Sequence, residues 1–235
     1  MQSIFFFFGL CIGSFLNVLA DRLPKEENVL WDRSRCDYCK KSLRWHELIP
    51  IVSFIAQRGR CLRCHKKLSL QYPLVELVTG IGFALLHAHP TSLIIFCAFL
   101  VILIADLKFQ IIPDSMVLAL AIGVVLRTGL VVPNLVTGVL SALFFYCIWL
   151  STRGKGMGFG DVKLAGVLGL LLGFPMTVFA LYIAFLTGAT VGVILIIGKR
   201  KTLKSKIAFG PFLIFGAVGT ILFHQQLLVL WNTIL

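Results

Sequence analysis

The sequence contains few charged residues, and fewer acidic than basic ones. Only 14% of its 235 residues are charged, Asp and Glu together number 10, and no charge stands between Lys163 and Lys199. A chain that is 58% hydrophobic, with a mean hydropathy of +0.95, has too little polar surface for an ordinary soluble domain. We therefore expect an all-α, polytopic membrane protein.

Eight apolar segments are candidates for membrane-spanning helices, since about 20 residues cross the hydrocarbon core. They cover approximately residues 3–20, 74–89, 92–105, 115–131, 134–150, 159–172, 176–197 and 207–230. The first has no basic residue before it and no small-x-small cleavage site after it, so we expect a retained helix and not a secretory signal. The GFP triplet at Gly173–Pro175 predicts a tight hairpin that divides the long uncharged run.

These segments suggest a division of the chain into three parts. Residues 1–20 would form a first transmembrane helix, residues 21–72 a cytoplasmic loop, and residues 73–235 a transmembrane bundle of about seven helices. The loop would be the single large cytoplasmic one.

The basic residues predict the orientation in the inner (cytoplasmic) membrane, because Lys and Arg of short loops stay on the cytoplasmic side. With eight spans and both chain ends outside, 21 of the 22 Lys and Arg fall on the cytoplasmic side and only Arg127 falls on the other. The net charge of +12 then reflects topology and contact with the anionic headgroups of the lipid bilayer. It gives no reason to expect a nucleic-acid partner.

Four cysteines in the loop predict a metal site. Cys36 and Cys39 form one C-x-x-C pair, Cys61 and Cys64 form another, and 21 residues separate the pairs. This pattern is typical of tetrahedral zinc, with iron as the rarer alternative. Two disulfides are the other interpretation, but a reducing cytoplasm and the two-residue gaps oppose it. Four thiolates leave no open coordination position, so the Zn²⁺ would be structural.

Two acidic residues stand at the predicted cytoplasmic edge of the membrane. Asp106 ends the third apolar segment, Asp161 begins the sixth, and Asp114 follows nearby in the sequence IIPD. Each alone has an ordinary explanation, because Asp161 could cap a helix and Asp106 could be an interfacial acid beside Lys108. Acids at one membrane depth can also build a polar site between facing helices. Both interpretations stay open at this point.

Six motifs, in order along the chain, carry a resemblance to a known family. They are GSFLNVLADRLP from Gly13, WHELIPIVS between the cysteine pairs, YPLVELVTG from Tyr72, ADLKFQIIPD from Ala105, MGFGDVKL from Met157 and FGPFL from Phe209. With these motifs the chain resembles the bacterial type IV prepilin peptidases, membrane aspartic proteases with a GxGD signature. The resemblance implies cleavage of the leader from prepilins or pilin-like pseudopilins, just after a glycine, on the cytoplasmic side.

The resemblance also implies that Asp106 and Asp161 are the catalytic pair. Two such acids would share a proton, so that one polarises the scissile carbonyl while the other takes a proton from water. Gly158 and Gly160 would let a substrate backbone approach closely. Many relatives have a second acid two places after the first aspartate, where this chain has Lys108. The supporting residues that we expect are Asp114, Gly158, Gly160 and Lys163.

Some members of that family also methylate the new amino terminus, which raises S-adenosylmethionine as a second cofactor. The glycine-rich stretch GKGMGFG, from Gly154 to Gly160, is not the G-x-G-x-x-G fingerprint and follows a predicted helix where the fingerprint needs a strand. The sequence therefore shows no familiar site for that cofactor.

Two functions of other classes explain part of the sequence. An ion-coupled transporter would relay protons through Asp106, Asp114, Asp161 and Glu76, but it explains neither the cysteines nor the edge location of the acids. A membrane anchor whose zinc loop binds a partner protein would leave the acids without a role. Neither the particular prepilin nor an oligomeric state follows from the sequence.

Overall fold

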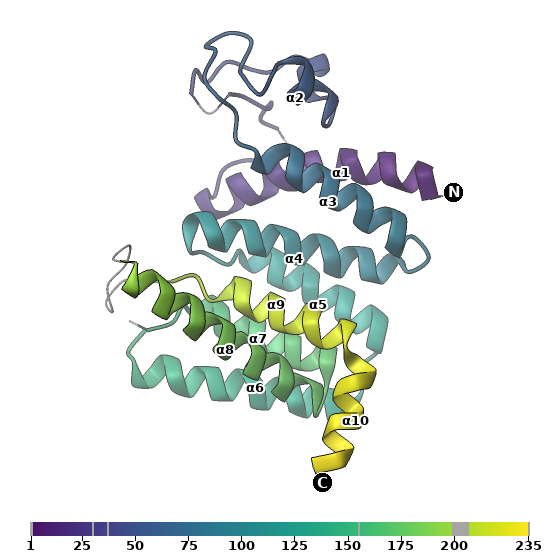
Figure 1. Ribbon diagram of the computed structural model, residues 1–235, viewed down its shortest axis with the longest axis vertical. Helices are drawn as coiled ribbons and strands as arrows, with labels where there is room; N and C mark the ends of the chain where they lie inside the picture. The colour runs from purple at the N-terminus through teal and green to yellow at the C-terminus, as the bar shows by residue number, and fades with distance from the viewer. Residues whose placement is uncertain (1, 30, 37, 155, 199–206, 235) are drawn as a thin grey trace. The chain divides into compact units, whose positions relative to one another are not determined.

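The computed structural model describes residues 2–29, 31–36, 38–154, 156–198 and 207–234, and its named elements in these ranges are all helical (Figure 1). The basic run 199–206, which contributes to the orientation prediction, lies outside the described residues. The chain forms two compact units, residues 1–101 and 102–235, and the division falls within α4 (Pro90–Phe109). The predicted three-part division is not tested by these units and stays a prediction.

Unit 1, residues 1–101, contains two helices that pack closely. α1 (Gln2–Arg22) lies against α3 (Gln71–Leu86). A Cβ on Gly13 would stand 2.7 Å from the Cα of Glu76, so glycine is what lets the two backbones approach so closely. The segment between these helices forms two 3-10 turns, Leu23–Lys25 and Trp45–Leu48, and one short helix, α2 (Val52–Ala56).

Unit 2, residues 102–235, is a helix bundle. After the end of α4 it contains α5 (Asp114–Thr128), α6 (Val132–Ser151), α7 (Phe159–Leu172), α8 (Met176–Ile197), α9 (Gly210–Leu222) and α10 (His224–Ile234). α7 contacts α5, α6, α8 and α9, and its residues Leu164, Ala165 and Leu168 are almost completely buried. This packing fixes the first turn of α7, which carries Asp161.

Every predicted apolar segment is helical, but the prediction of eight spans is not confirmed. Within the described ranges, only α1, α4, α6 and α8 are long and apolar enough to cross a membrane. The segment predicted as one span over 207–230 is divided into α9 and α10, which meet at a bend of 82° and would make a fifth span if counted together. The hairpin at Gly173–Pro175 is confirmed, because α7 ends just before it and α8 begins just after it.

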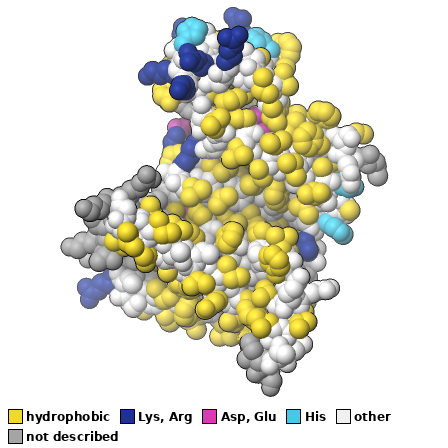
Figure 2. Space-filling view, in the orientation of Figure 1, with side chains coloured by type: hydrophobic (Ala, Val, Ile, Leu, Met, Phe, Trp, Pro, Cys, Tyr) yellow, Lys and Arg dark blue, Asp and Glu magenta, His cyan; other side chains and the backbone are white. Residues whose placement is uncertain are grey.

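The surface of the helices is apolar. In the view of Figure 2, hydrophobic side chains cover most of the helical surface, while Lys and Arg gather on the cysteine-rich loop. Leu126, Val139 and Ile194 are each more than half exposed. Such a surface is unfavourable in water, and helices with internally satisfied backbones suit it to lipid. The chain is therefore a multi-pass membrane protein.

Candidate active site

Asp161 lies in the first turn of α7, where Gly158 is the N-cap residue. The backbone N–H of Gly158 donates to Oδ2 of Asp161 at 3.1 Å, so the helix-cap interpretation accounts for one carboxylate oxygen. The other oxygen, Oδ1, is buried and has no hydrogen-bond partner among the described residues. Leaving a buried polar atom unpaired costs roughly 1–3 kcal/mol, so capping alone does not explain this side chain. Oδ1 of Asp161 can therefore bind a proton or accept a hydrogen bond from a ligand.

Asp106 lies in the last turn of α4 and is only 4% exposed. The backbone N–H of Gly210, the first residue of α9, donates to Oδ2 of Asp106 at 2.9 Å. A Cβ on Gly210 would stand 2.7 Å from the same oxygen, so a larger residue at this position would displace the Asp106 carboxylate. Each of the two aspartates is thus held by a backbone N–H at a helix N-terminus, where the helix dipole favours negative charge.

Both aspartates line one cavity of about 300 Å³ within unit 2. The charge of Asp106 acts on Asp161, so the two carboxyl groups lie close enough to repel each other when both are ionised. Two carboxyl groups that share a cavity oppose each other's ionisation. Ile112, Met157 and Phe209 contribute apolar parts of the lining. Asp106 and Asp161, which the sequence places at one edge of the membrane, thus line the same cavity.

Asp114 and Lys163 line the same cavity and form an ion pair. Nζ of Lys163 donates to Oδ1 of Asp114 at 2.7 Å, and the side chain of Asp114 is 73% exposed. The Lys163 ammonium also lies 5.3 Å from the centre of the Phe159 ring. An ion pair this exposed contributes about 0–1 kcal/mol to stability. The pair therefore contributes little to the stability of the fold.

The two predicted glycines have structural reasons of their own. Gly158 supplies the N–H that holds Asp161. Gly160 faces Ile112, and a Cβ on Gly160 would stand 2.9 Å from the Ile112 Cβ. Close approach of a substrate backbone is not needed to explain either position. Sequence reasoning missed the role of Gly210, although the FGPFL motif contains it, because a backbone donor has no signature in residue type.

The four loop cysteines converge, as predicted. Their sulfur atoms all lie within 4.8 Å of one another, and the Sγ atoms of Cys36 and Cys64 are 3.8 Å apart. Tetrahedral zinc with Zn–S bonds of about 2.3 Å requires sulfur–sulfur separations of about 3.8 Å. All seven cysteines of the chain are free thiols, so the disulfide interpretation has no support. The cluster fits a metal ion held by four thiolates.

The two cysteine pairs share backbone features at the residues that the structure describes. Lys40 and His65 follow them with positive φ angles of 56° and 54°, and their N–H groups each donate at 2.9 Å to the carbonyl of the first cysteine of the pair. An antiparallel bridge closes each knuckle, Arg35 with Ser42 and Arg60 with Lys67. The equivalent residues belong to an internal repeat, R-C-x-x-C-x-K, that occurs twice in the sequence. Sequence reasoning did not use this signal.

Backbone N–H groups favour the thiolate form of Cys61, which is the form that binds metal. The backbone N–H groups of Cys64 and Arg63 lower the pKa of the Cys61 thiol to about 7, whereas burial raises the pKa of the Cys36 thiol to about 11. Cys61 therefore ionises more readily than Cys36. A metal ion bound there would displace the protons of the remaining thiols, since only thiolates are good ligands.

Comparison with known proteins separates the chain into two matched regions. The family described as Bacterial Peptidase A24 N-terminal domain matches residues 7–89, and the Type IV leader peptidase family matches residues 93–193. A protein of Bacillus subtilis named prepilin leader peptidase/N-methyltransferase is 32% identical, over 97% of this chain and 96% of its own. Proteins of the same name from Burkholderia pseudomallei and Legionella pneumophila are each 33% identical, over 92% and 88% of this chain and 83% and 85% of theirs. No solved structure matches.

The chain belongs to the type IV leader peptidase family. Asp106 and Asp161 fall in the region that matches the peptidase family, and the four cysteines fall in the region that matches the N-terminal domain. The resemblance carried by the six motifs is confirmed.

Proposed function

We propose that this protein is a membrane-embedded aspartic endopeptidase that removes the leader from type IV prepilins or pseudopilins, with Asp106 and Asp161 as its catalytic residues. The assignment of the catalytic residues rests on one observation. Two buried carboxylates, from α4 and α7, converge on one cavity, and each is held by a single backbone N–H. Membership of the family supplies the reaction class, and the names of the relatives supply the class of substrate.

A pair of acids that shares one proton can hydrolyse a peptide without a covalent intermediate. The protonated carboxyl donates a hydrogen bond to the scissile carbonyl oxygen, while the ionised carboxylate takes a proton from a water molecule whose oxygen bonds to the carbonyl carbon. The intermediate then collapses: the C–N bond breaks, and the leaving nitrogen receives a proton from the pair. The products are the carboxyl terminus of the leader and a free amine on the mature pilin. The two acids titrate as a unit.

The backbone donors fix which oxygen atoms take part. Gly158 and Gly210 each bind the Oδ2 atom of one aspartate. Oδ1 of Asp161, which is buried and unpartnered among the described residues, is therefore the atom that we assign to the shared proton or to the attacking water. Donors that are already oriented need no rearrangement during the reaction.

The surroundings of the site complete the proposal. The distribution of Lys and Arg favours a cavity and a cysteine loop at the cytoplasmic face of the inner membrane. The thiolates of Cys36, Cys39, Cys61 and Cys64 would hold a structural Zn²⁺, whose binding energy stabilises the folded loop. Asp114 and Lys163 would meet the substrate at the cavity, and the prepilin would reach it from the lipid bilayer.

The purified chain alone, in detergent with a full-length prepilin, tests the proposal against the transporter and the anchor. Mass spectrometry should find one cut, on the carboxyl side of a glycine. Asp32→Asn is the matched control, because Asp32 is exposed in the loop and its side chain pairs only with Arg35 in the contacts described. It should cleave at the parent rate. If the purified parent yields no product from any prepilin tested, the proposed activity is wrong.

A further inference from the structure

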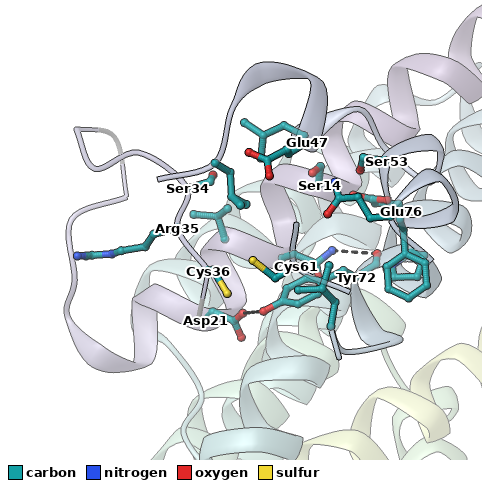
Figure 3. Close-up of a pocket in the computed structure, with 18 of the residues that line it drawn as sticks. Ser14, Asp21, Ser34, Arg35, Cys36, Glu47, Ser53, Cys61, Tyr72 and Glu76 are labelled. Carbon is teal, nitrogen blue, oxygen red and sulfur yellow. Dashed lines mark hydrogen bonds between the residues drawn. The ribbon is translucent and has the colours of Figure 1, made fainter. Parts of the chain in front are cut away.

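The motif WHELIPIVS, between the two cysteine pairs, has no part in the proposed catalytic site. It forms the 3-10 turn Trp45–Leu48 and continues into α2 (Val52–Ala56). One side of this segment faces a cavity of about 510 Å³ within unit 1 (Figure 3), which is lined by Glu47, Ser53 and Phe54 among others. The opposite side carries large apolar residues outside that lining. This opposite side, the apolar patch, consists of Trp45, Ile49, Val52 and Ile55.

The apolar patch is exposed. Trp45, Val52 and Ile55 are 78%, 60% and 68% exposed, and Ile49 is 38% exposed. Val52 and Ile55 stand three residues apart, so they lie on the same face of α2. Adjacent large apolar side chains are unfavourable in water, and such a patch marks a surface that binds a partner or a membrane.

A hydrogen bond holds the patch beside α3. Ile51 has a φ of 60°, which is unfavourable for a β-branched residue. Glu76, in the second turn of α3, accepts the backbone N–H of Ile51 at 2.8 Å. Leu74 and Leu77 lie within two residues of Glu76 in the sequence, and both are exposed. In Figure 2, hydrophobic side chains continue from the loop onto the helices. The patch therefore extends the apolar surface that suits α3 to lipid.

The chain around the patch is strongly basic. Between residues 38 and 75 the only acid is Glu47, and this residue is buried. The same stretch has eight basic residues, which are all exposed and form no ion pair within the described part of the chain. They are Lys40, Lys41, Arg44, Arg58, Arg60, Arg63, Lys66 and Lys67. A Zn²⁺ ion on four thiolates would add negative charge, but not enough to cancel eight cations. The loop therefore suits an anionic surface.

Basic residues stand at both ends of the apolar patch. Arg44 directly precedes Trp45. At the other end, the backbone N–H of Arg58 donates to the carbonyl of Ile55 at 2.9 Å, and Arg60 follows two residues later. An exposed tryptophan and aliphatic side chains with Lys and Arg beside them are typical of segments that lie in the interface between water and lipid.

We propose that the apolar patch inserts into the headgroup region of an anionic bilayer, and that the basic residues around it bind the lipid headgroups. The loop begins at the end of α1, which is long enough to cross the membrane, so a bilayer surface is within its reach. Anionic lipid attracts clustered Lys and Arg, and the apolar side chains reach the boundary of the acyl chains. The contact holds the cysteine loop at the membrane surface. This role is separate from the proposed peptidase, and its test needs no peptidase activity.

A cross-linker carried by lipid tests this contact. The full-length purified chain is placed in nanodiscs of phosphatidylcholine, or of phosphatidylcholine and phosphatidylglycerol in equal parts, with a trace of phospholipid that carries a diazirine on its acyl chain. Trypsin cuts after Arg44 and Arg58, so the whole patch is recovered in the peptide 45–58. This peptide should carry about tenfold more label in the anionic nanodiscs. The peptide 1–22, which contains α1, is the reference, because it should be labelled in both.

Paired variants separate the apolar contribution from the charged one. Val52→Asp with Ile55→Asp should lower the label on the patch by about tenfold or more, because it places charges where the acyl chains begin. Val52→Ile with Ile55→Leu keeps the patch apolar and should be labelled like the parent. Arg58→Gln with Arg60→Gln should lower the label in anionic nanodiscs towards the level in phosphatidylcholine, on a tryptic peptide that now extends to residue 63. Arg127→Gln removes one cation from unit 2 and should change nothing.

Each variant must match the parent in zinc content and in its melting curve in detergent, so that a loss of label does not report an unfolded loop. A parent whose peptide 1–22 is labelled while the peptide 45–58 is not would overturn the proposal, since a protein surface or water would then cover the patch. Equal label on the patch in the two kinds of nanodisc would remove the role of the anionic headgroups. An equal loss in Arg127→Gln would show that the effect does not come from the loop.

Discussion

Replacing Gly210 by Ala tests whether a backbone donor positions the catalytic pair. The new Cβ would stand 2.7 Å from Oδ2 of Asp106 and 3.3 Å from its Cγ. Ordinary van der Waals contact begins at 3.4 Å, so the carboxylate must move by about 0.7 Å. A misplacement of about 1 Å in a reacting group can cost about 100-fold in rate. We therefore expect kcat to fall by roughly 10- to 100-fold, equivalent to about 1.4–2.7 kcal/mol of activation free energy.

The assay is the rate of leader removal from a purified prepilin, measured over a range of substrate concentrations. KM should stay within about twofold, because the substitution displaces a reacting group and not a binding surface. Gly219→Ala is the matched control in the same helix, since a Cβ there meets nothing within 4 Å. It should leave the rate unchanged. In an Asp106→Asn background, Gly210→Ala should cause little further loss, because both changes act on one group.

Two results would refute this reasoning. The first is a folded Gly210→Ala variant with the parent kcat, since the contact with Asp106 would then be irrelevant to the reaction. The second is an equal loss in Gly219→Ala, which would assign the effect to α9 as a whole. The melting curves of both variants in detergent must match that of the parent, so that a loss of activity is not interpreted when the variant is unfolded.

Other parts of the account are tested more simply. Elemental analysis should find about one zinc per chain in the parent and in Cys147→Ser, a change on the surface of α6, but none in Cys36→Ser. Full zinc content in Cys36→Ser would contradict the four-thiolate site. An alkaline phosphatase fusion after Gly129 should be active outside the cytoplasm and one after Ser42 inactive, and the reverse pattern would invert the topology. Asp114→Asn should cost less than about tenfold in kcat, because this acid is exposed and pairs with a lysine; a loss as large as that of Asp161→Asn would make it a member of the catalytic group.

The helices could be located from the sequence, but the number of spans could not. An apolar run in a membrane must satisfy its backbone internally, so each run is helical wherever it lies. The length of an apolar run does not reveal whether its helix crosses the membrane. For example, α7 has only 14 residues and is enclosed by other helices of unit 2. The bend between α9 and α10 could not be predicted either. Residues 223 and 224 are Phe and His, and neither is a proline or a glycine that would indicate a break in the helix.

The chemical groups of the sites could be predicted better than the groups that hold them. Asp106, Asp161 and the cysteines have residue types and spacings that point to their chemistry. The donor at Gly210 is a backbone amide 104 residues from Asp106, and no spacing rule joins the two. The cavity of unit 1 was missed for the same reason, because α1, the loop and α3 each contribute only part of its wall. Glu76 was considered as a proton relay, whereas it lines that cavity.

The most direct test of the central claim is the rate of prepilin cleavage by purified Asp106→Asn, Asp161→Asn and the double variant. Asn keeps an oxygen that can accept the N–H of Gly210 or Gly158 but cannot ionise, so each single change should slow cleavage by at least about 1,000-fold, and the double variant should be little slower. Helix content and detergent melting must match the parent. If a folded Asp161→Asn chain still cleaves the prepilin at close to the parent rate, the aspartic mechanism is wrong.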